Sequence, residues 1–127
     1  MKILVVEDSP SMRAYVTTLV ESYPDAEDIE IVEASSGFEA LKVLPHHKLD
    51  AILTDINMPD INGLELVSFI KNHPGYKGIP ILVISTESSE EDRRRAEALG
   101  AEEYLVKPFA PEELLSKLRR ILGKSST

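Results

Sequence analysis

The sequence contains no cysteine among its 127 residues. Disulfide bonds and thiol chemistry are therefore excluded, and the composition fits a protein of a reducing compartment. Long hydrophobic runs are also missing, so we expect no transmembrane segment and no association with a membrane. Residues 1–8 turn acidic too early for a signal peptide. Together these absences predict a cytoplasmic protein.

Positive charge is scarce as well. The 14 lysine and arginine residues are outnumbered by 22 aspartate and glutamate residues, which gives a formal net charge of −8. Nucleic acids attract basic surfaces, so we expect no direct nucleic-acid binding. Arg93, Arg94 and Arg95 form a basic run, but acidic residues surround it, which predicts a solvated helix face. The negative charge suits basic partners or a bound cation.

What the sequence does contain is an alternation of apolar runs and amphipathic segments that recurs five times. The length of the chain indicates one domain with a single core. Such an alternation is typical of βα units, which build a parallel sheet with helices. The predicted strands are residues 2–6, 29–34, 50–54, 79–84 and 102–106.

Signals for the start of a helix follow several of these strands. Ser9-Pro10 places a polar N-cap before a proline at the first helical position. Ser36–Glu39 and Ser88–Glu91 both have the spacing of a capping box. Phe38 and Phe69 are predicted to face the core. The fourth helix has few apolar residues, which indicates a loosely held, mobile element.

Four of the five predicted strands end in residues that can carry chemistry. These are Glu7 and Asp8 after the first strand, Asp55 after the third, Ser85 after the fourth and Lys107 after the fifth. The carboxyl ends of parallel strands meet at one edge of a sheet, where α/β proteins bind ligands. We therefore expect these side chains to lie together. Three neighbouring carboxylates need a compensating cation, and oxygen ligands are those that Mg²⁺ prefers.

This combination predicts a site for one phosphoryl group. Asp55 is the expected nucleophile, because a carboxylate can form an aspartyl-phosphate. Mg²⁺ and Lys107 would neutralise charge on the phosphoryl oxygens, and the Ser85 hydroxyl would donate a hydrogen bond. Each residue also has a simpler interpretation when it is considered alone. Glu7-Asp8 and Ser85 would then be helix caps or turn residues, and Lys107 a surface lysine.

Over nearly its whole length, the chain resembles the receiver domain of response regulators in bacterial two-component systems. The resemblance rests on the acidic pair Glu7-Asp8, Asp55 in T-D-I-N-M-P, Ser85 in V-I-S-T-E and Lys107 in Y-L-V-K-P-F. It implies an α/β, doubly wound, flavodoxin-like (βα)5 fold, with a five-stranded parallel sheet in the order 2-1-3-4-5 and helices on both faces. Residues 1–122 would form the receiver, and residues 123–127 a tail or the start of a linker.

The resemblance also implies a role for each residue of the site. Asp55 would accept a phosphoryl group from a sensor histidine kinase or a phosphotransfer protein. Glu7, Asp8, Asp55 and the main-chain carbonyl of Asn57 would hold Mg²⁺, although many relatives carry aspartate in place of Glu7. Lys107-Pro108 would be joined by a cis peptide bond. The protein would not be an enzyme beyond catalysing its own phosphorylation and dephosphorylation.

Two further pairs are implied by the family. Ser85 and Tyr104 would form the switch, with Ser85 turning toward the phosphoryl group and Tyr104 swinging inward to fill the vacated space. Tyr104 can also be interpreted as an aromatic residue half-buried on a strand. Asn57 and Glu87 resemble the pair found in chemotaxis-type receivers that dephosphorylate themselves quickly. They predict a phosphoryl lifetime of seconds to minutes.

Several alternatives remain open. Met1 and the short tail favour a stand-alone receiver that controls a downstream protein. The ending also fits the N-terminal receiver of a longer regulator with an attached DNA-binding or enzymatic effector domain. Phosphorylation would leave the protein a monomer or make it a dimer. A small aspartyl-phosphate phosphatase is less favoured, because Asn57 stands where those enzymes carry a general-acid aspartate. A flavin-binding protein is disfavoured because Glu7-Asp8 would repel a phosphate.

Overall fold

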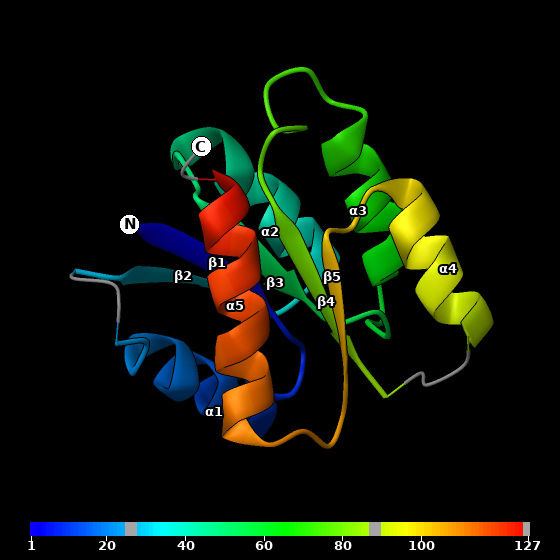
Figure 1. Cartoon of the computed structure of the whole chain (residues 1–127). Coiled ribbons are helices and arrows are strands. Elements are labelled where there is room, and N and C mark those ends of the chain that lie inside the picture. The colour runs from blue at the N-terminus through cyan, green and yellow to red at the C-terminus, as the bar shows by residue number, and fades with distance from the viewer. Residues whose placement is uncertain (25–27, 87–89, 126–127) are drawn as a thin grey trace.

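A computed structural model of the protein describes residues 1–24, 28–86 and 90–125 (Figure 1). Its strands and helices alternate along the chain, as the sequence pattern predicts. The strands are β1 Lys2–Val6, β2 Glu30–Ala34, β3 Ala51–Thr54, β4 Ile81–Ser85 and β5 Glu103–Val106. The helices are α1 Pro10–Glu21, α2 Gly37–Val43, α3 Gly63–Lys71, α4 Glu90–Leu99 and α5 Pro111–Ser125, with a short 3-10 helix, η1, at Leu44–His46.

The five strands form one parallel sheet in the order β2-β1-β3-β4-β5. This order confirms the predicted doubly wound fold. β1 lies between β2 and β3, with Leu4 opposite both Val32 and Ile52. A helical crossover returns the chain to the same end of the sheet after each strand, which makes every pair parallel. The carboxyl ends of all five strands consequently meet at one edge.

Helices cover both faces of the sheet (Figure 1). Successive side chains of a strand point to opposite faces, so each central strand contributes to two cores. In β1, Ile3 and Val5 pack with residues of α1 and α5, whereas Leu4 and Val6 pack with residues of α2, α3 and α4. All four side chains are buried. Burial on both faces explains why this strand is an unbroken apolar run.

The strands begin slightly later than predicted. β4 starts at Ile81, because the Ile79 N–H donates to the carbonyl of Tyr76 at 2.9 Å in a turn and Pro80 has no N–H to donate. The other differences are one residue at the starts of β2, β3 and β5. The carboxyl ends, which carry the candidate site, lie where the sequence predicts them, and β4 extends to include Ser85.

The prediction that Phe38 and Phe69 face the core is wrong. Phe38 is 57% exposed and Phe69 is 45% exposed. In α2 the inward position belongs to Ala40, and in α3 to Val67 and Ile70. With 3.6 residues per turn, both phenylalanines therefore fall outside the buried stripe of their helices.

The predicted helix caps are formed in part. Ser9 caps α1 with its side chain. The side chain of Ser36 accepts from the N–H of Glu39 at 3.1 Å, but the Glu39 carboxylate accepts from the N–H of Ser35 at 2.9 Å. The Glu39 carboxylate therefore bonds to Ser35, the residue before the N-cap, and not to the backbone N–H of the N-cap Ser36, as a complete capping box would require. The predicted box at Ser88–Glu91 falls partly on residues outside the described ranges.

The last two helices differ in how they are held. α4 buries Ala96 alone among its residues, in keeping with its weakly apolar sequence. α5 packs Leu114 and Leu118 into the core and continues to Ser125, beyond the predicted end of the domain at Leu122. In the part of the chain that the structure describes, no helix is both long and apolar enough to cross a membrane.

Candidate functional site

The carboxyl edge of the sheet brings together the charged residues predicted to form a site. Glu7 and Asp8 follow β1, Asp55 follows β3 and Lys107 follows β5. Carboxylate oxygens of the three acidic residues all lie within 4.8 Å of one another. The Nζ of Lys107 lies 2.8 Å from Oε1 of Glu7 and 3.4 Å from Oδ2 of Asp55. The expected juxtaposition of carboxylates and lysine is therefore present.

Backbone contacts fix the position of Asp55. Its N–H donates to the carbonyl of Val6 at 3.1 Å, which extends the pairing of β1 and β3 by one residue. Its Oδ1 accepts from the N–H of Ile56 at 2.7 Å, and the residue is only 7% exposed. Gly63 begins α3 directly against this residue, since a Cβ there would lie 1.9 Å from the Asp55 carbonyl oxygen. Only glycine permits such a close approach.

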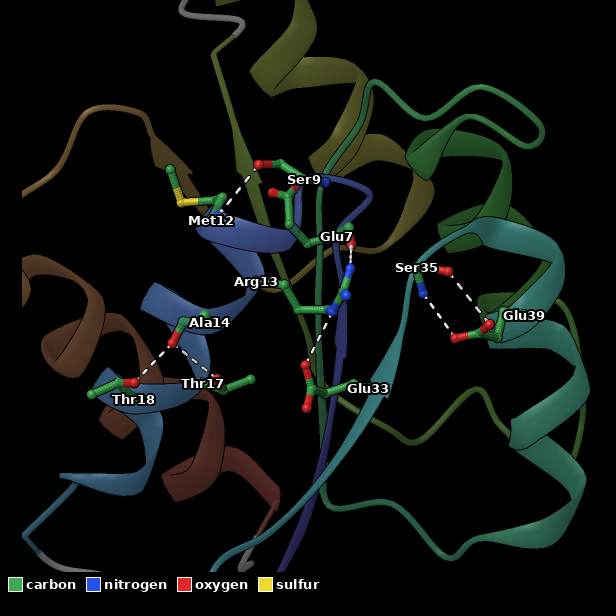
Figure 2. Close-up of polar contacts among 10 residues, drawn as sticks. All are labelled: Glu7, Ser9, Met12, Arg13, Ala14, Thr17, Thr18, Glu33, Ser35 and Glu39. Carbon is green, nitrogen blue, oxygen red and sulfur yellow. Dashed lines mark hydrogen bonds and ion pairs between the residues drawn. The ribbon is translucent and has the colours of Figure 1, made fainter.

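The loop between β1 and α1 carries the acidic pair, of which Figure 2 shows Glu7. Glu7 is 4% exposed, and its Oε2 accepts from the N–H of Ser9 at 3.1 Å. The hydroxyl of Ser9 in turn accepts from the N–H of Met12 at 3.3 Å. Asp8 is exposed. One carboxylate of the pair is thus enclosed in the site and the other is open to water.

The charges of the site are not balanced. Burial raises the pKa of Glu7, hydrogen bonds from Lys107 and Ser9 oppose that rise, and the neighbouring Asp55 carboxylate adds to it. One lysine among three carboxylates leaves the cluster negative. A negative cluster of oxygen atoms is electrostatically complementary to a small divalent cation.

The residues present fit Mg²⁺. The three side chains offer carboxylate oxygens, which this hard cation prefers. Asp8 opens the cluster to solvent, and Mg²⁺ usually keeps several water ligands. Asn57, the predicted source of a main-chain ligand, is exposed on the loop that leaves the site after Asp55.

The predicted switch residues lie on adjacent strands. Ser85 ends β4 and is fully buried, and Tyr104 lies on β5 opposite Val83. Tyr104 is 4% exposed, so it is buried rather than half-buried. The guanidinium carbon of Arg93 stands 5.5 Å from the centre of its ring, within reach of a cation–π interaction. Glu87 lies outside the described residues.

Lys107 approaches the site from the end of β5. Its N–H donates to the carbonyl of Ser85 at 2.8 Å, which continues the pairing of β4 and β5. The peptide bond that follows it, to Pro108, is cis. The Lys107 side chain is 11% exposed, so a largely desolvated ammonium group lies beside the carboxylates. Such a group is suited to pairing with an anion.

Three residues that shape the site were not predicted from the sequence. Gly63 supports Asp55, as described above. Arg13 donates from Nη1 to the main-chain carbonyl of Glu7 at 2.7 Å. Asp60 accepts from two backbone N–H groups at the start of α2, at 3.1 and 2.8 Å, and the closer one, from Phe38, lowers the pKa of Asp60 to about 2. The turn-forming Asn62-Gly63 pair at the start of α3 is a usable signal. The Asp60 contacts join segments more than 20 positions apart, and the bond from Arg13 to Glu7, although only six positions long, carries no sequence signature.

The fold and the site together define an α/β protein with an acidic, lysine-containing cluster at the carboxyl edge of a doubly wound sheet. The family model for the response regulator receiver domain matches residues 3–119. The chain belongs to this family, whose members are signalling domains of two-component systems rather than enzymes that act on separate substrates.

Similar proteins and solved structures support the same assignment. A chemotaxis protein CheY homolog of Campylobacter jejuni is 38% identical over 128 residues, covering 99% of this chain and 95% of that protein. The chemotaxis response regulator CheY4 of Vibrio cholerae is 39% identical, with a TM-score of 0.85 and coverage of 95% of this chain and 98% of that one. The receiver domain of sensor histidine kinase PA1611 of Pseudomonas aeruginosa, solved with a magnesium ion coordinated in its active-site cleft, is 26% identical, with a TM-score of 0.83 and coverage of 96% and 97%.

Proposed function

We propose that the protein is a phosphorylation-operated switch of a two-component system. Asp55 accepts a phosphoryl group from a phosphohistidine of a sensor kinase or a phosphotransfer protein. The observation that carries this proposal is the cluster itself, in which Lys107 and two further carboxylates surround the buried Asp55. The protein would act in the cytoplasm and control a downstream protein or an attached effector domain.

The chemistry follows from the positions of the side chains. An oxygen of the Asp55 carboxylate attacks phosphorus, the P–N bond of the phosphohistidine breaks, and the leaving imidazole keeps the electron pair and takes up a proton. Bound Mg²⁺, held by Glu7, Asp8, Asp55 and the Asn57 carbonyl, would neutralise charge on the phosphoryl oxygens. The N–H of Ile56 holds one oxygen of the nucleophile at 2.7 Å, so the carboxylate reacts from a fixed orientation.

Lys107 changes partners in this scheme. Before the reaction its ammonium group pairs with Glu7 and Asp55. Once Asp55 carries a phosphoryl group, the phosphoryl oxygens offer a stronger anion in the same place, and Lys107 pairs with them instead. The same residue therefore balances charge before and after the transfer.

The response to phosphorylation would pass through Ser85 and Tyr104. Ser85 donates its hydroxyl to the phosphoryl group, and Tyr104 moves into the space that this side chain leaves. Because α4 is anchored by little buried surface and Arg93 stands over the tyrosine ring, this helix would respond to the change. A partner protein, or a second copy of the chain, would read the altered surface.

The decisive experiment is incubation with acetyl phosphate and Mg²⁺, followed by intact mass measurement of the wild type and of Asp55→Asn. We expect the wild type to gain one phosphoryl group only when Mg²⁺ is present, and the variant to gain none. A wild type that stays unmodified by acetyl phosphate and by a panel of phosphorylated histidine kinases would overturn the proposal. The decay of the modified wild type would then test the expected lifetime of seconds to minutes, for which Asn57 and Glu87 would be responsible.

A further inference from the structure

Arg13 links three parts of the molecule through one guanidinium group (Figure 2). It lies on α1, and its Nη1 donates to the main-chain carbonyl of Glu7 at 2.7 Å. Its Nε donates to Oε1 of Glu33, on β2, at 3.1 Å. The Arg13 side chain is 20% exposed, whereas that of Glu33 is 53% exposed. The ion pair is therefore on the surface, and the bond to the carbonyl lies beneath it.

This carbonyl belongs to the peptide group that joins the two acidic residues. The N–H of Glu7 donates to the carbonyl of Ala34 at 3.0 Å, so the peptide group before Glu7 is held by β2. Arg13 holds the peptide group after Glu7, between it and Asp8. The orientation of that second peptide plane sets the direction in which the chain, and with it the Asp8 carboxylate, continues.

We propose that Arg13 is a positioning residue for the divalent-cation site, and this inference rests on the function proposed above. Its planar guanidinium group can bond the Glu7 carbonyl and Glu33 at once, which a lysine cannot do with the same geometry. By fixing the peptide between Glu7 and Asp8, it holds the two carboxylates in the spacing that a bound cation requires. Groups that orient metal ligands typically contribute tenfold or more to metal affinity.

The sign of the effect separates this role from a purely electrostatic one. Arg13 carries a positive charge close to a cation site, and like charges repel over the screening length of about 8 Å at physiological salt. If charge alone mattered, removal of Arg13 would strengthen Mg²⁺ binding. If Arg13 orients the ligands, its removal weakens binding in spite of the lost repulsion.

The test is isothermal titration calorimetry with Mg²⁺ on the whole chain. We expect Arg13→Ala and Arg13→Lys each to raise the Kd by about tenfold. Glu33→Gln keeps the bond to the carbonyl and should give a smaller loss in the same direction. Arg120→Ala is the matched control and should leave the Kd unchanged. Arg120 is an exposed arginine on α5 that pairs with Glu103 on β5.

Thermal unfolding without Mg²⁺ accompanies each titration. An Arg13→Ala protein that binds Mg²⁺ as tightly as the wild type, or more tightly, overturns the inference, even if its Tm is lower. If Arg13→Ala does not fold, Arg13→Lys decides in the same way. A wild type that binds no Mg²⁺ and gains no phosphoryl group would overturn the proposed function as well. A wild type that binds Mg²⁺ and is phosphorylated, with Arg13 variants of unchanged Kd, would remove only the positioning role.

Discussion

The Nζ of Lys107 lies closer to Glu7, at 2.8 Å, than to Asp55, at 3.4 Å. The lysine is thus held mainly by a residue that is not the proposed phosphoryl acceptor. Under the proposed function, this pairing leaves the Asp55 carboxylate available as the nucleophile.

The first prediction concerns Glu7→Gln and pH. Burial raises the pKa of Glu7 in the folded protein, so the folded state binds more protons than the unfolded state between the unfolded and the folded pKa. The contribution of Glu7 to the free energy of unfolding therefore falls as pH rises through that window. We expect the wild type to gain stability relative to Glu7→Gln as pH is lowered through it. Urea unfolding in EDTA at a series of pH values measures this difference, and the opposite slope would contradict the prediction.

The second prediction concerns Gly63→Ala. An added Cβ would meet the Asp55 carbonyl oxygen at 1.9 Å, and this backbone atom cannot yield as a flexible side chain would. We expect the free energy of unfolding to fall by about 2–3 kcal/mol, as for other forced overpacking. Phosphoryl uptake from acetyl phosphate should slow as well, because Asp55 must shift.

Gly78→Ala is the matched control for that change. A Cβ at Gly78 would meet no atom within 4 Å, so stability and phosphoryl uptake should both stay near the wild-type values. Urea denaturation and intact mass measurement on the two variants provide the comparison. Equal effects from the two substitutions would refute the view that Gly63 is required by its contact with Asp55.

The third prediction concerns Asp60→Ala. The Asp60 carboxylate accepts from the N–H groups of Gly37 and Phe38 and ties the loop after Asp55 to the start of α2. Its pKa is lowered to about 2, so the stability it contributes is complete above the unfolded pKa and is lost as pH falls toward 2. We expect a lower Tm for Asp60→Ala at neutral pH and a difference that shrinks below about pH 4. A difference independent of pH would show that ionisation of Asp60 is not the cause.

The fourth prediction concerns Lys71→Met. Lys71 lies at the end of the sheet where the strands begin, opposite the candidate site. The ammonium group of Lys71 donates to the carbonyl of Ile79 and to Glu102, both at 2.8 Å, and its side chain is 11% exposed. Removing it leaves Glu102 without its cation, so we expect a loss of about 2–3 kcal/mol in the free energy of unfolding. The Mg²⁺ affinity should not change, and calorimetry on the variant checks this separation between stability and function.

The sequence was sufficient to predict the strands and the residues at their carboxyl ends, because both depend on local order. An apolar run marks each strand, and the next polar residue marks its end, so Glu7, Asp55 and Lys107 could be placed without knowledge of any contact. Parallel topology then brings these ends together. The residues that hold the acidic cluster in place from neighbouring segments could not be predicted in this way.

The direction of some side chains and the contacts between distant segments could not be predicted from the sequence, for physical reasons. Phe38 and Phe69 face solvent because a helix turns by about 100° per residue, so small differences in its phase decide which side is buried. Arg13 and Asp60 bond to backbone or side-chain atoms of segments far along the chain. Nothing in the local composition of either residue distinguishes it from an ordinary surface charge.

The ion pair between Glu7 and Lys107 spans 100 positions of the sequence. During synthesis, Glu7 leaves the ribosome early, whereas Lys107 follows only after the residues of all five strands have been made. A nascent chain therefore has acidic residues at hand but lacks the cation that holds them in place. Under the proposed function, the site that receives the phosphoryl group is therefore complete only after the fifth strand has docked.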